Sequence, residues 1–97
     1  MISHTVTFSL VHDADSDAES DFLDTAARVL ASIPGVTDFT ISRQVSAKSP
    51  LRFHFAMGFA DQAAYDAYNI HPTHIGFVEG RWVPEVSDFQ ELDFLPR

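Results

Sequence analysis

The stretch Leu51–Phe59, LRFHFAMGF, alternates between two kinds of side chain and thereby indicates the fold class. Its odd-numbered members are all large and apolar, whereas the intervening residues Arg52, His54, Ala56 and Gly58 are mostly small or polar. Because successive side chains of a β-strand point to opposite faces, the pattern predicts a strand with one face against a hydrophobic core. The second face of this strand lies outside that core.

Three other segments read as strands. Residues 2–11 alternate in the same way, and one polar side chain, His4, lies among the apolar residues of the inward face. Residues 36–46 alternate again, and the segment Val86–Leu95 has strand-like composition. The sequence therefore predicts four strands.

Helices are expected between these strands. Residues 13–33 begin with acidic and serine residues and continue with apolar residues at helical spacing, up to Ile33-Pro34-Gly35. Asp61 is expected to cap a short second helix, and Pro72 suits the first turn of a new one because that turn needs no N–H from it. The order β-α-β-β-α(α)-β predicts an α+β fold, a ferredoxin-like four-stranded antiparallel sheet with helices on one face.

Composition limits the partners of this fold. The 97 residues suffice for a single domain, 1–97, and nine phenylalanines with one tryptophan supply a large aromatic core. A bare sheet face is costly in water, so we expect a homodimer formed through that face, a dimeric α/β barrel. Fourteen acidic against six basic residues give a net charge of −8, which disfavours nucleic acid and anionic membranes as partners.

Location and redox chemistry are constrained in the same way. The chain has no cysteine, and we expect neither a signal peptide nor a membrane span, because no long apolar run is present. A cytoplasmic protein is the expectation. The acidic run from Asp13 to Asp24 has aspartates at calcium-loop spacing, but Ala18 stands where that loop needs glycine, so a solvated helix start is favoured.

Several motifs, taken together, resemble the stress-responsive A/B barrel (Dabb) family. They are His4-x-Val6-x-Phe8, Ile33-Pro34-Gly35-Val36, Tyr68-x-x-His71-Pro72-x-His74-x-x-Phe77 and Asp93-Phe94, in the family's order over the whole chain. The resemblance implies a dimer of two ferredoxin-like protomers packed sheet against sheet. It departs from the family pattern at Ser9, where a lysine is common, and at Ser42, where a glycine is frequent.

The resemblance also implies site residues. One enzymatic member of the family, olivetolic acid cyclase, closes a linear polyketide by aldol condensation with a tyrosine and a histidine. Those positions match Tyr68 and His74 here, and the family's first-strand histidine and late aspartate match His4 and Asp93. The family thus suggests a pocket near these four residues.

The residues themselves allow three interpretations of His74. It lies in the first turn of the helix begun by Pro72, on the face shared with Phe77 and Trp82. The positive end of that helix keeps an imidazole neutral, so it can serve as a general base if Asp93 or His4 fixes its tautomer. Tyr68 would then donate a hydrogen bond to a developing oxyanion. The alternatives are a pocket that binds without chemistry and histidines that are simply packed.

Metal binding is a further alternative that the sequence does not favour. His71 and His74 are three residues apart, with His4 or Asp93 as a third ligand, but His71 precedes a proline and is expected at a junction rather than in the helix. We therefore expect no metal and no cofactor. The prediction is a homodimeric module that binds a small apolar, aromatic or polyketide-like ligand through His4, Asp93, His71, Phe77 and Trp82; the alternative is a cyclase-like enzyme with His74 as base and Tyr68 as donor.

Overall fold

The computed structural model describes all residues, 1–97, and contains the predicted elements in the predicted order. The helical connection before the last strand is divided into several pieces, one of which is a π-helical turn, η1. The elements are β1 Ile2–Leu10, α1 Asp17–Leu30, β2 Thr37–Arg43, β3 Phe53–Phe59, α2 Gln62–Ile70, α3 Pro72–Phe77, η1 Val78–Trp82, α4 Val83–Glu85 and β4 Val86–Phe94.

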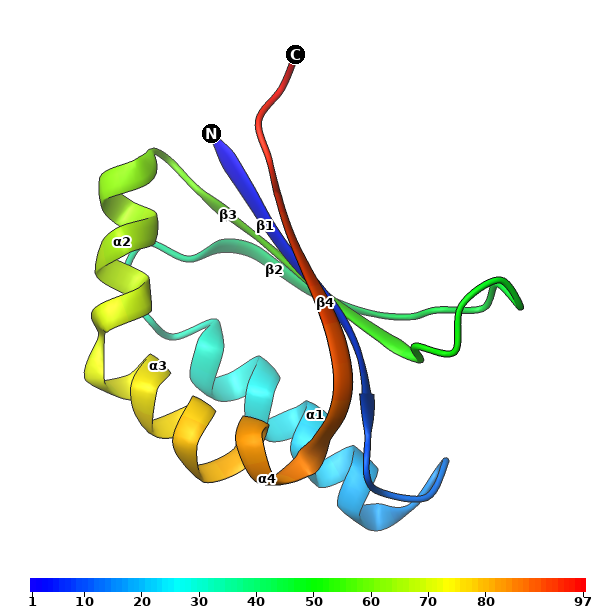
Figure 1. Ribbon diagram of the computed structural model, residues 1–97. Helices are drawn as coiled ribbons and strands as arrows, with labels where there is room; N and C mark the ends of the chain where they lie inside the picture. The colour runs from blue at the N-terminus through cyan, green and yellow to red at the C-terminus, as the bar shows by residue number, and fades with distance from the viewer.

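One four-stranded sheet organises the chain, in the order β2-β3-β1-β4 with every neighbouring pair antiparallel. All helices lie on the same side of it, and the opposite side is open (Figure 1). This arrangement confirms the ferredoxin-like prediction. Because β1 is central, His4 stands between Met57 of β3 and Asp93 of β4 in the register, which brings the two ends of the chain together at one point.

The core lies between the sheet and the helices and is mainly aromatic. Phe8, Phe22, Phe55 and Phe59 are its largest fully buried side chains, and each contributes about 2 kcal/mol by leaving water. The alternation predicted for β1 is confirmed, since Ile2, His4, Val6 and Phe8 are all buried. His4 is thus a polar side chain inside an apolar layer.

Helix α1 begins as its sequence predicts. The Ser16 hydroxyl accepts a hydrogen bond from the Glu19 N–H at 3.2 Å, and the Glu19 carboxylate accepts one from the Asp15 N–H at 3.2 Å. These reciprocal bonds satisfy backbone donors that a helix start leaves free. The acidic run therefore forms the start of α1. After the helix, Gly35 takes a φ of +91°, which a side chain would strain.

The second and third strands are shorter than predicted. Strand β2 ends at Arg43 rather than 46, and β3 starts at Phe53 rather than Leu51, so residues 44–52 form a long loop. Backbone pairing ends with the bond from the Gln44 N–H to the Arg52 carbonyl at 2.8 Å, after which the Gln44 side-chain amide donates to the carbonyls of Ser49 and Leu51. Pro50 has no N–H with which to extend the ladder. A bulge between Thr37 and Thr40, with Asp38 at a φ of +53°, further shortens the regular part of β2.

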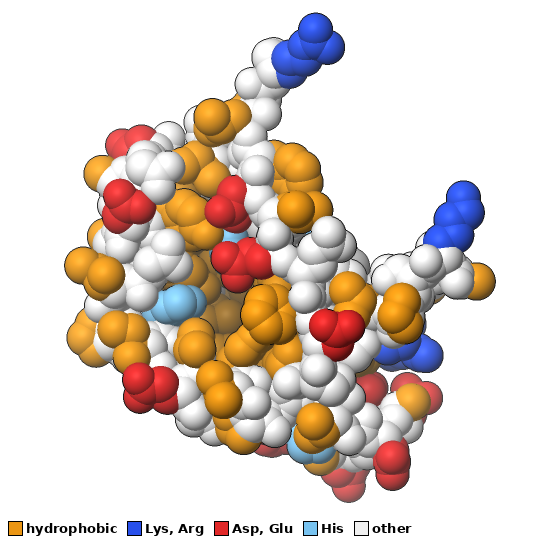
Figure 2. Space-filling view, viewed as in Figure 1, with side chains coloured by type: hydrophobic (Ala, Val, Ile, Leu, Met, Phe, Trp, Pro, Cys, Tyr) orange, Lys and Arg blue, Asp and Glu red, His pale blue; other side chains and the backbone are white.

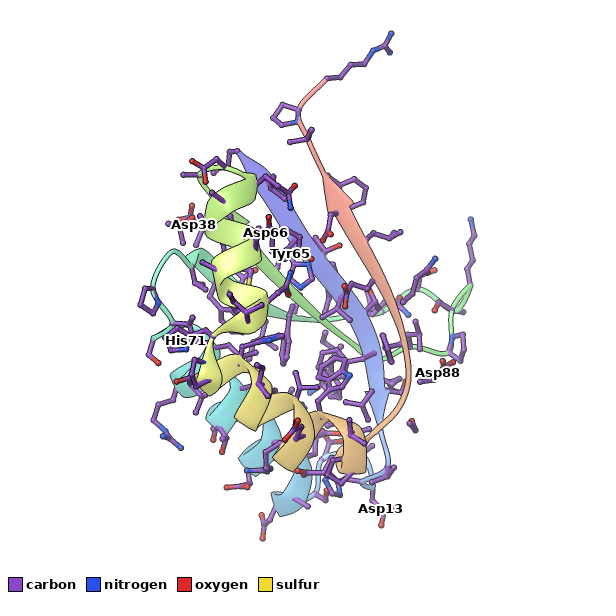
Figure 3. All side chains as sticks on the ribbon, turned by 60° about the vertical axis from the view of Figure 1, so that its left-hand side comes forward. Asp13, Asp38, Tyr65, Asp66, His71 and Asp88 are labelled. Atoms are coloured by element: carbon purple, nitrogen blue, oxygen red, sulfur yellow. The ribbon has the colours of Figure 1, made fainter.

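The chain turns sharply at His71-Pro72, between α2 and α3. His71 is extended, with φ −65° and ψ 133°, and its Nδ1 accepts a hydrogen bond from the Thr73 N–H at 3.1 Å. Figure 3 shows His71 at this corner, whereas Tyr65 lies higher along α2 beside the sheet. The predicted position of His71 at a junction is confirmed. No helix in the structure is both long and apolar enough to cross a membrane.

Candidate functional site

A cavity of about 490 Å³ lies between the helix-covered face of the sheet and the connection α2–α4. Its size falls within the range typical of small-molecule sites. Figure 2 shows it as a hollow bordered by hydrophobic side chains, with a histidine and carboxylates at its rim. Eleven of its fifteen lining residues are hydrophobic; the fifteen are His4, Val6, Leu30, Phe55, Met57, Tyr68, Asn69, His74, Phe77, Val78, Trp82, Val83, Val86, Phe89 and Glu91.

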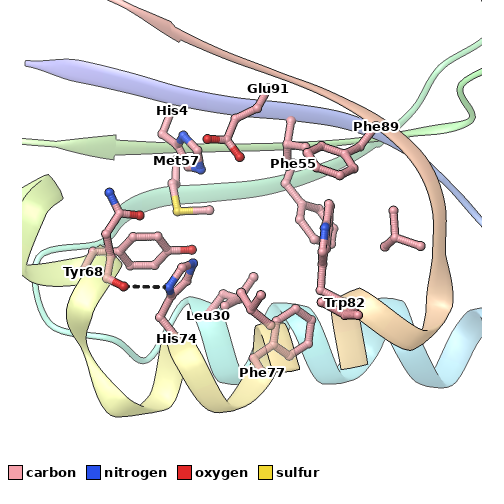
Figure 4. Close-up of a pocket in the computed structure, with 15 residues that line it drawn as sticks. His4, Leu30, Phe55, Met57, Tyr68, His74, Phe77, Trp82, Phe89 and Glu91 are labelled. Carbon is pink, nitrogen blue, oxygen red and sulfur yellow. Dashed lines mark hydrogen bonds between the residues drawn. The ribbon is translucent and has the colours of Figure 1, made fainter. Parts of the chain in front are cut away.

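Trp82 forms the aromatic end of this cavity. Its ring lies 5.0 Å from that of Phe8 and 5.6 Å from that of Phe89, measured between centroids. The π-helical turn η1 contains Trp82, and the N–H of Val83 bonds to the carbonyl of Val78, five residues back. This wider turn keeps Trp82 on the same side as Phe77, so both predicted residues line the cavity (Figure 4).

His74 enters the cavity from the first turn of α3. Its Nδ1 lies 3.2 Å from the carbonyl oxygen of Asn69, a carbonyl in the last turn of α2 that has no partner within that helix. A carbonyl only accepts, so Nδ1 carries the proton and Nε2 presents its lone pair. Burial lowers the pKa of His74, although the hydrogen bond to Asn69 partly opposes that effect. His74 is therefore a neutral imidazole with a basic nitrogen available.

The partner of His74 differs from the predicted one. Asp93 or His4 was expected to fix its tautomer, but a backbone carbonyl does so. The reason is local geometry. The corner at Pro72 turns α3 back under α2, and this places the imidazole beside the last carbonyls of α2.

Tyr68 stands next to His74, with 4.3 Å between the two ring centroids. Its side chain is 2% exposed, and burial raises the pKa of its hydroxyl above the usual value, so the group stays protonated. No protein group forms a hydrogen bond with this hydroxyl. Every fully buried polar side-chain atom in the protein has a hydrogen-bond partner, so the oxygen of Tyr68 must be accessible from the cavity that the residue lines. The Tyr68 hydroxyl is thus a hydrogen-bond donor that a ligand can use.

His4 reaches the cavity from the sheet and is held by two other side chains. Its Nδ1 lies 2.6 Å from Asp93 Oδ1 and 3.0 Å from the Tyr65 hydroxyl oxygen, and that hydroxyl donates to Asp93 Oδ2 at 2.9 Å. The carboxylate accepts from both groups, so the Nδ1 of His4 carries a proton and its Nε2 faces away from Asp93. Burial and the bond to Asp93 raise the pKa of Tyr65.

The structure brings five of the seven sequence-predicted residues into the cavity lining: His4, Tyr68, His74, Phe77 and Trp82. Two others lie outside the lining. Asp93 is behind His4 and holds it, and His71 caps α3 at the corner.

Asn69 and three further residues near the site were missed by sequence reasoning. Tyr65 is one helical turn before Tyr68, and the spacing of three residues places both on the buried face of α2. Phe89 and Glu91 share a strand face with Asp93, since side chains two apart along β4 point the same way. Extending the period of two back from Asp93 would have identified both.

Known proteins were compared with this chain by sequence and by structure. No functionally curated protein matches the sequence. A Dabb family protein from Mesorhizobium loti with a ferredoxin-like fold is 51% identical, with a TM-score of 0.98 over 99% of this chain and 96% of that one. Two more distant structures share the fold. A dimeric ferredoxin-like protein of unknown function from Thermobifida fusca is 18% identical (TM-score 0.80; 98% and 90% covered). A hydroxynitrile lyase from Passiflora edulis is 9% identical (TM-score 0.85; 99% and 93% covered).

The family resemblance seen in the sequence is confirmed by a family model, described as the stress-responsive A/B barrel domain, which matches residues 2–96. That match spans both terminal strands, and so includes His4 and Asp93 as well as the helical corner with Tyr68 and His74. This chain belongs to the stress-responsive A/B barrel domain family.

Proposed function

We propose that this protein binds a small aromatic or apolar molecule that carries a hydrogen-bonding oxygen, in the cavity between the sheet and the helices. The observation that supports this most strongly is an apolar cavity of about 490 Å³ whose unsatisfied polar groups include the Tyr68 hydroxyl and the Nε2 of His74, side by side. A carbonyl or phenol oxygen placed between them would accept from Tyr68, and a phenol could also donate to His74. Apolar walls with a few convergent polar groups are the usual form of a ligand site.

The test is a binding measurement with a panel of small phenols, aryl ketones and polyketide-like compounds, read by calorimetry. Phenols that bind wild type should bind His74→Gln about tenfold more weakly, since the hydrogen bond from the phenol hydroxyl to Nε2 is lost, whereas ketones, which only accept, should keep most of their affinity. The matched control is His71→Gln, which changes a histidine three residues away that does not line the cavity. Equal affinities for wild type and both variants would argue against binding in this cavity.

The same proposal includes a homodimer formed through the open face of the sheet. That face carries partly exposed apolar side chains of β4, with Leu92 47% and Phe94 52% exposed, beside the small residues Ser3 and Thr5 of β1. Flat rows of small and apolar residues pack well against a second sheet. The Thermobifida fusca protein of the same fold is described as dimeric.

Light scattering at micromolar concentration should give twice the mass of the chain for wild type. Leu92→Lys should shift the protein to a monomer, because two lysine ammonium groups would be buried at the interface. Glu79→Lys, on the exposed outer side of η1, is the control and should remain dimeric. A monomeric wild-type protein would contradict this part of the proposal.

One enzymatic alternative is favoured by a specific observation. His74 is neutral and its Nε2 is free, as a general base requires. The Tyr68 hydroxyl beside it is protonated, as a hydrogen-bond donor to an oxyanion requires. In an aldol cyclisation, Nε2 would take a proton from a carbon between two carbonyls while Tyr68 stabilises the enolate oxygen. The enolate carbon would then attack a second carbonyl of the same molecule, and the imidazolium would return its proton to the new alkoxide.

Incubation with linear poly-β-ketone thioesters, followed by liquid chromatography with mass spectrometry to separate the cyclised isomer from the linear substrate, would test this alternative. The alternative would be supported if wild type formed a cyclised product and if the rate of its formation were at least a hundredfold lower with His74→Gln and with Tyr68→Phe. Equal product yields with wild type and both variants would argue that the cyclisation is spontaneous. The distant likeness to a hydroxynitrile lyase extends only to the fold.

A further inference from the structure

The charge of the cavity is determined by one residue, Glu91 of β4. It is the only acidic residue among the fifteen in the lining, and neither lysine nor arginine lines the cavity. The arginine of the adjacent helical connection, Arg81, is engaged elsewhere, since it bonds to Asp21 at 2.8 Å and to Glu85. The carboxylate of Glu91 forms no ion pair and no hydrogen bond with any protein group. The cavity therefore holds an uncompensated negative charge.

The position of Glu91 makes this charge relevant to a ligand. Its partner in the register is Val6 of β1, two residues after His4 on the same face of the sheet, and its side chain points to the cavity near His4 (Figure 4). The field of the carboxylate reaches the opposite wall. The pKa of Tyr68 is raised mainly by burial and next by the neighbouring Tyr65, and the negative charge of Glu91 raises it further. Burial lowers the pKa of His74, and the same charge partly opposes that effect.

The rest of the cavity also suits a cationic ligand. Trp82, Phe55, Phe77 and Phe89 present aromatic rings, whose faces attract ammonium groups. Glu91 itself is exposed to solvent, so an ammonium group beside it would keep part of its hydration and would not require complete desolvation. An anionic ligand would meet the carboxylate with no cation in the lining to offset the repulsion.

We propose that Glu91 determines ligand charge, so that the cavity selects aromatic amines over aromatic acids of the same size. This inference rests on the proposed ligand-binding function and narrows its ligand class. The aromatic body would occupy the space between Trp82 and Tyr68, and the ammonium group would lie at the rim beside Glu91. The overall charge of −8 acts in the same direction at longer range, but salt screens it.

The test uses three phenols of nearly equal size: tyramine, 4-(2-hydroxyethyl)phenol as the alcohol, and 4-hydroxyphenylacetate, which are cationic, neutral and anionic at pH 7. Their dissociation constants are measured for wild type, Glu91→Gln and Glu79→Gln at 150 mM salt. Glu79→Gln removes the same unit of charge from an exposed position outside the lining, and so separates the local effect from net charge.

Wild type should bind the amine about tenfold more tightly than the acid, since one charge is attracted and the other repelled. Glu91→Gln should reduce that ratio to about twofold with little change for the alcohol, and Glu79→Gln should keep the wild-type ratio. Two results would overturn this inference and leave the ligand-binding proposal intact. In the first, the alcohol binds wild type, but the amine and the acid bind it with equal affinity. In the second, the ratio of amine to acid affinity is the same in Glu91→Gln as in wild type. If none of the three probes binds, the ligand-binding proposal fails and this inference fails with it.

Discussion

The two histidines of the cavity are held in different ways. His4, on β1, is fixed by the side chains of Asp93 and Tyr65. Asp93 comes from the neighbouring strand β4, which is far away in the sequence, and Tyr65 comes from helix α2. His74, from α3, is fixed by a single backbone carbonyl five residues before it. The first arrangement joins three parts of the fold, whereas the second joins only the two ends of a corner. We therefore expect His4 to matter mainly for stability and His74 mainly for the site.

The largest expected effect is that of His4→Ala on stability. The change removes a buried ring that packs 5.0 Å from Tyr65, and it leaves the Asp93 carboxylate and the Tyr65 hydroxyl with one partner fewer. We expect a loss of about 2–3 kcal/mol in the free energy of unfolding, measured with urea. His74→Ala, at a partly exposed position, should lose about 1 kcal/mol or less. Equal losses would remove the distinction between the two histidines.

A smaller effect separates the two tyrosines that accompany these histidines. Tyr65→Phe deletes the hydroxyl that donates to Asp93 at 2.9 Å, and should cost about 1 kcal/mol. Tyr68→Phe deletes a hydroxyl with no partner in the protein, so it should leave the free energy of unfolding nearly unchanged. The same urea titrations measure both. A loss for Tyr68→Phe as large as that for Tyr65→Phe would show that its hydroxyl has an internal partner.

The smallest effect is a pH dependence from His74. Its pKa in the folded state is lowered from the ordinary 6.5, so the unfolded chain binds this proton more readily. The free energy of unfolding should therefore rise with pH up to about 6.5 and then level off, with a contribution from His74 below about 1 kcal/mol. Urea titrations between pH 5 and 7.5 should show a shallower slope for His74→Gln than for wild type.

An unchanged slope in that variant would mean that the folded protein accommodates a protonated His74 as easily as the unfolded chain does. His71→Gln serves as the matched control here also, because His71 caps a helix at the corner and lies outside the cavity.

Much of this site could be predicted from the sequence because its residues follow local rules. Pro72 fixes where α3 begins, and helical spacing then places His74 and Phe77 on one face, to which the π-helical turn η1 adds Trp82. Alternation along β1 places His4 inside the core. Asn69 and Tyr65 were missed for a common reason: each acts through a hydrogen-bond partner that the sequence pattern does not identify. Asn69 was missed because its contribution is a backbone carbonyl, which every residue has, and Tyr65 because its partner Asp93 is 28 residues away.

The sequence by itself determined the order of strands and helices, the buried faces of β1, β3 and α1 and the corner at His71-Pro72, because these depend on side-chain periodicity and on proline over short distances. The tertiary structure alone decided that Asp93 and Tyr65 hold His4, that a carbonyl of α2 holds His74, and that Glu91 stands unpaired in the lining. Those features depend on the register between β1 and β4 and on the angle between α2 and α3. Such long-range geometry arises from packing of the whole core and leaves no local pattern in the chain.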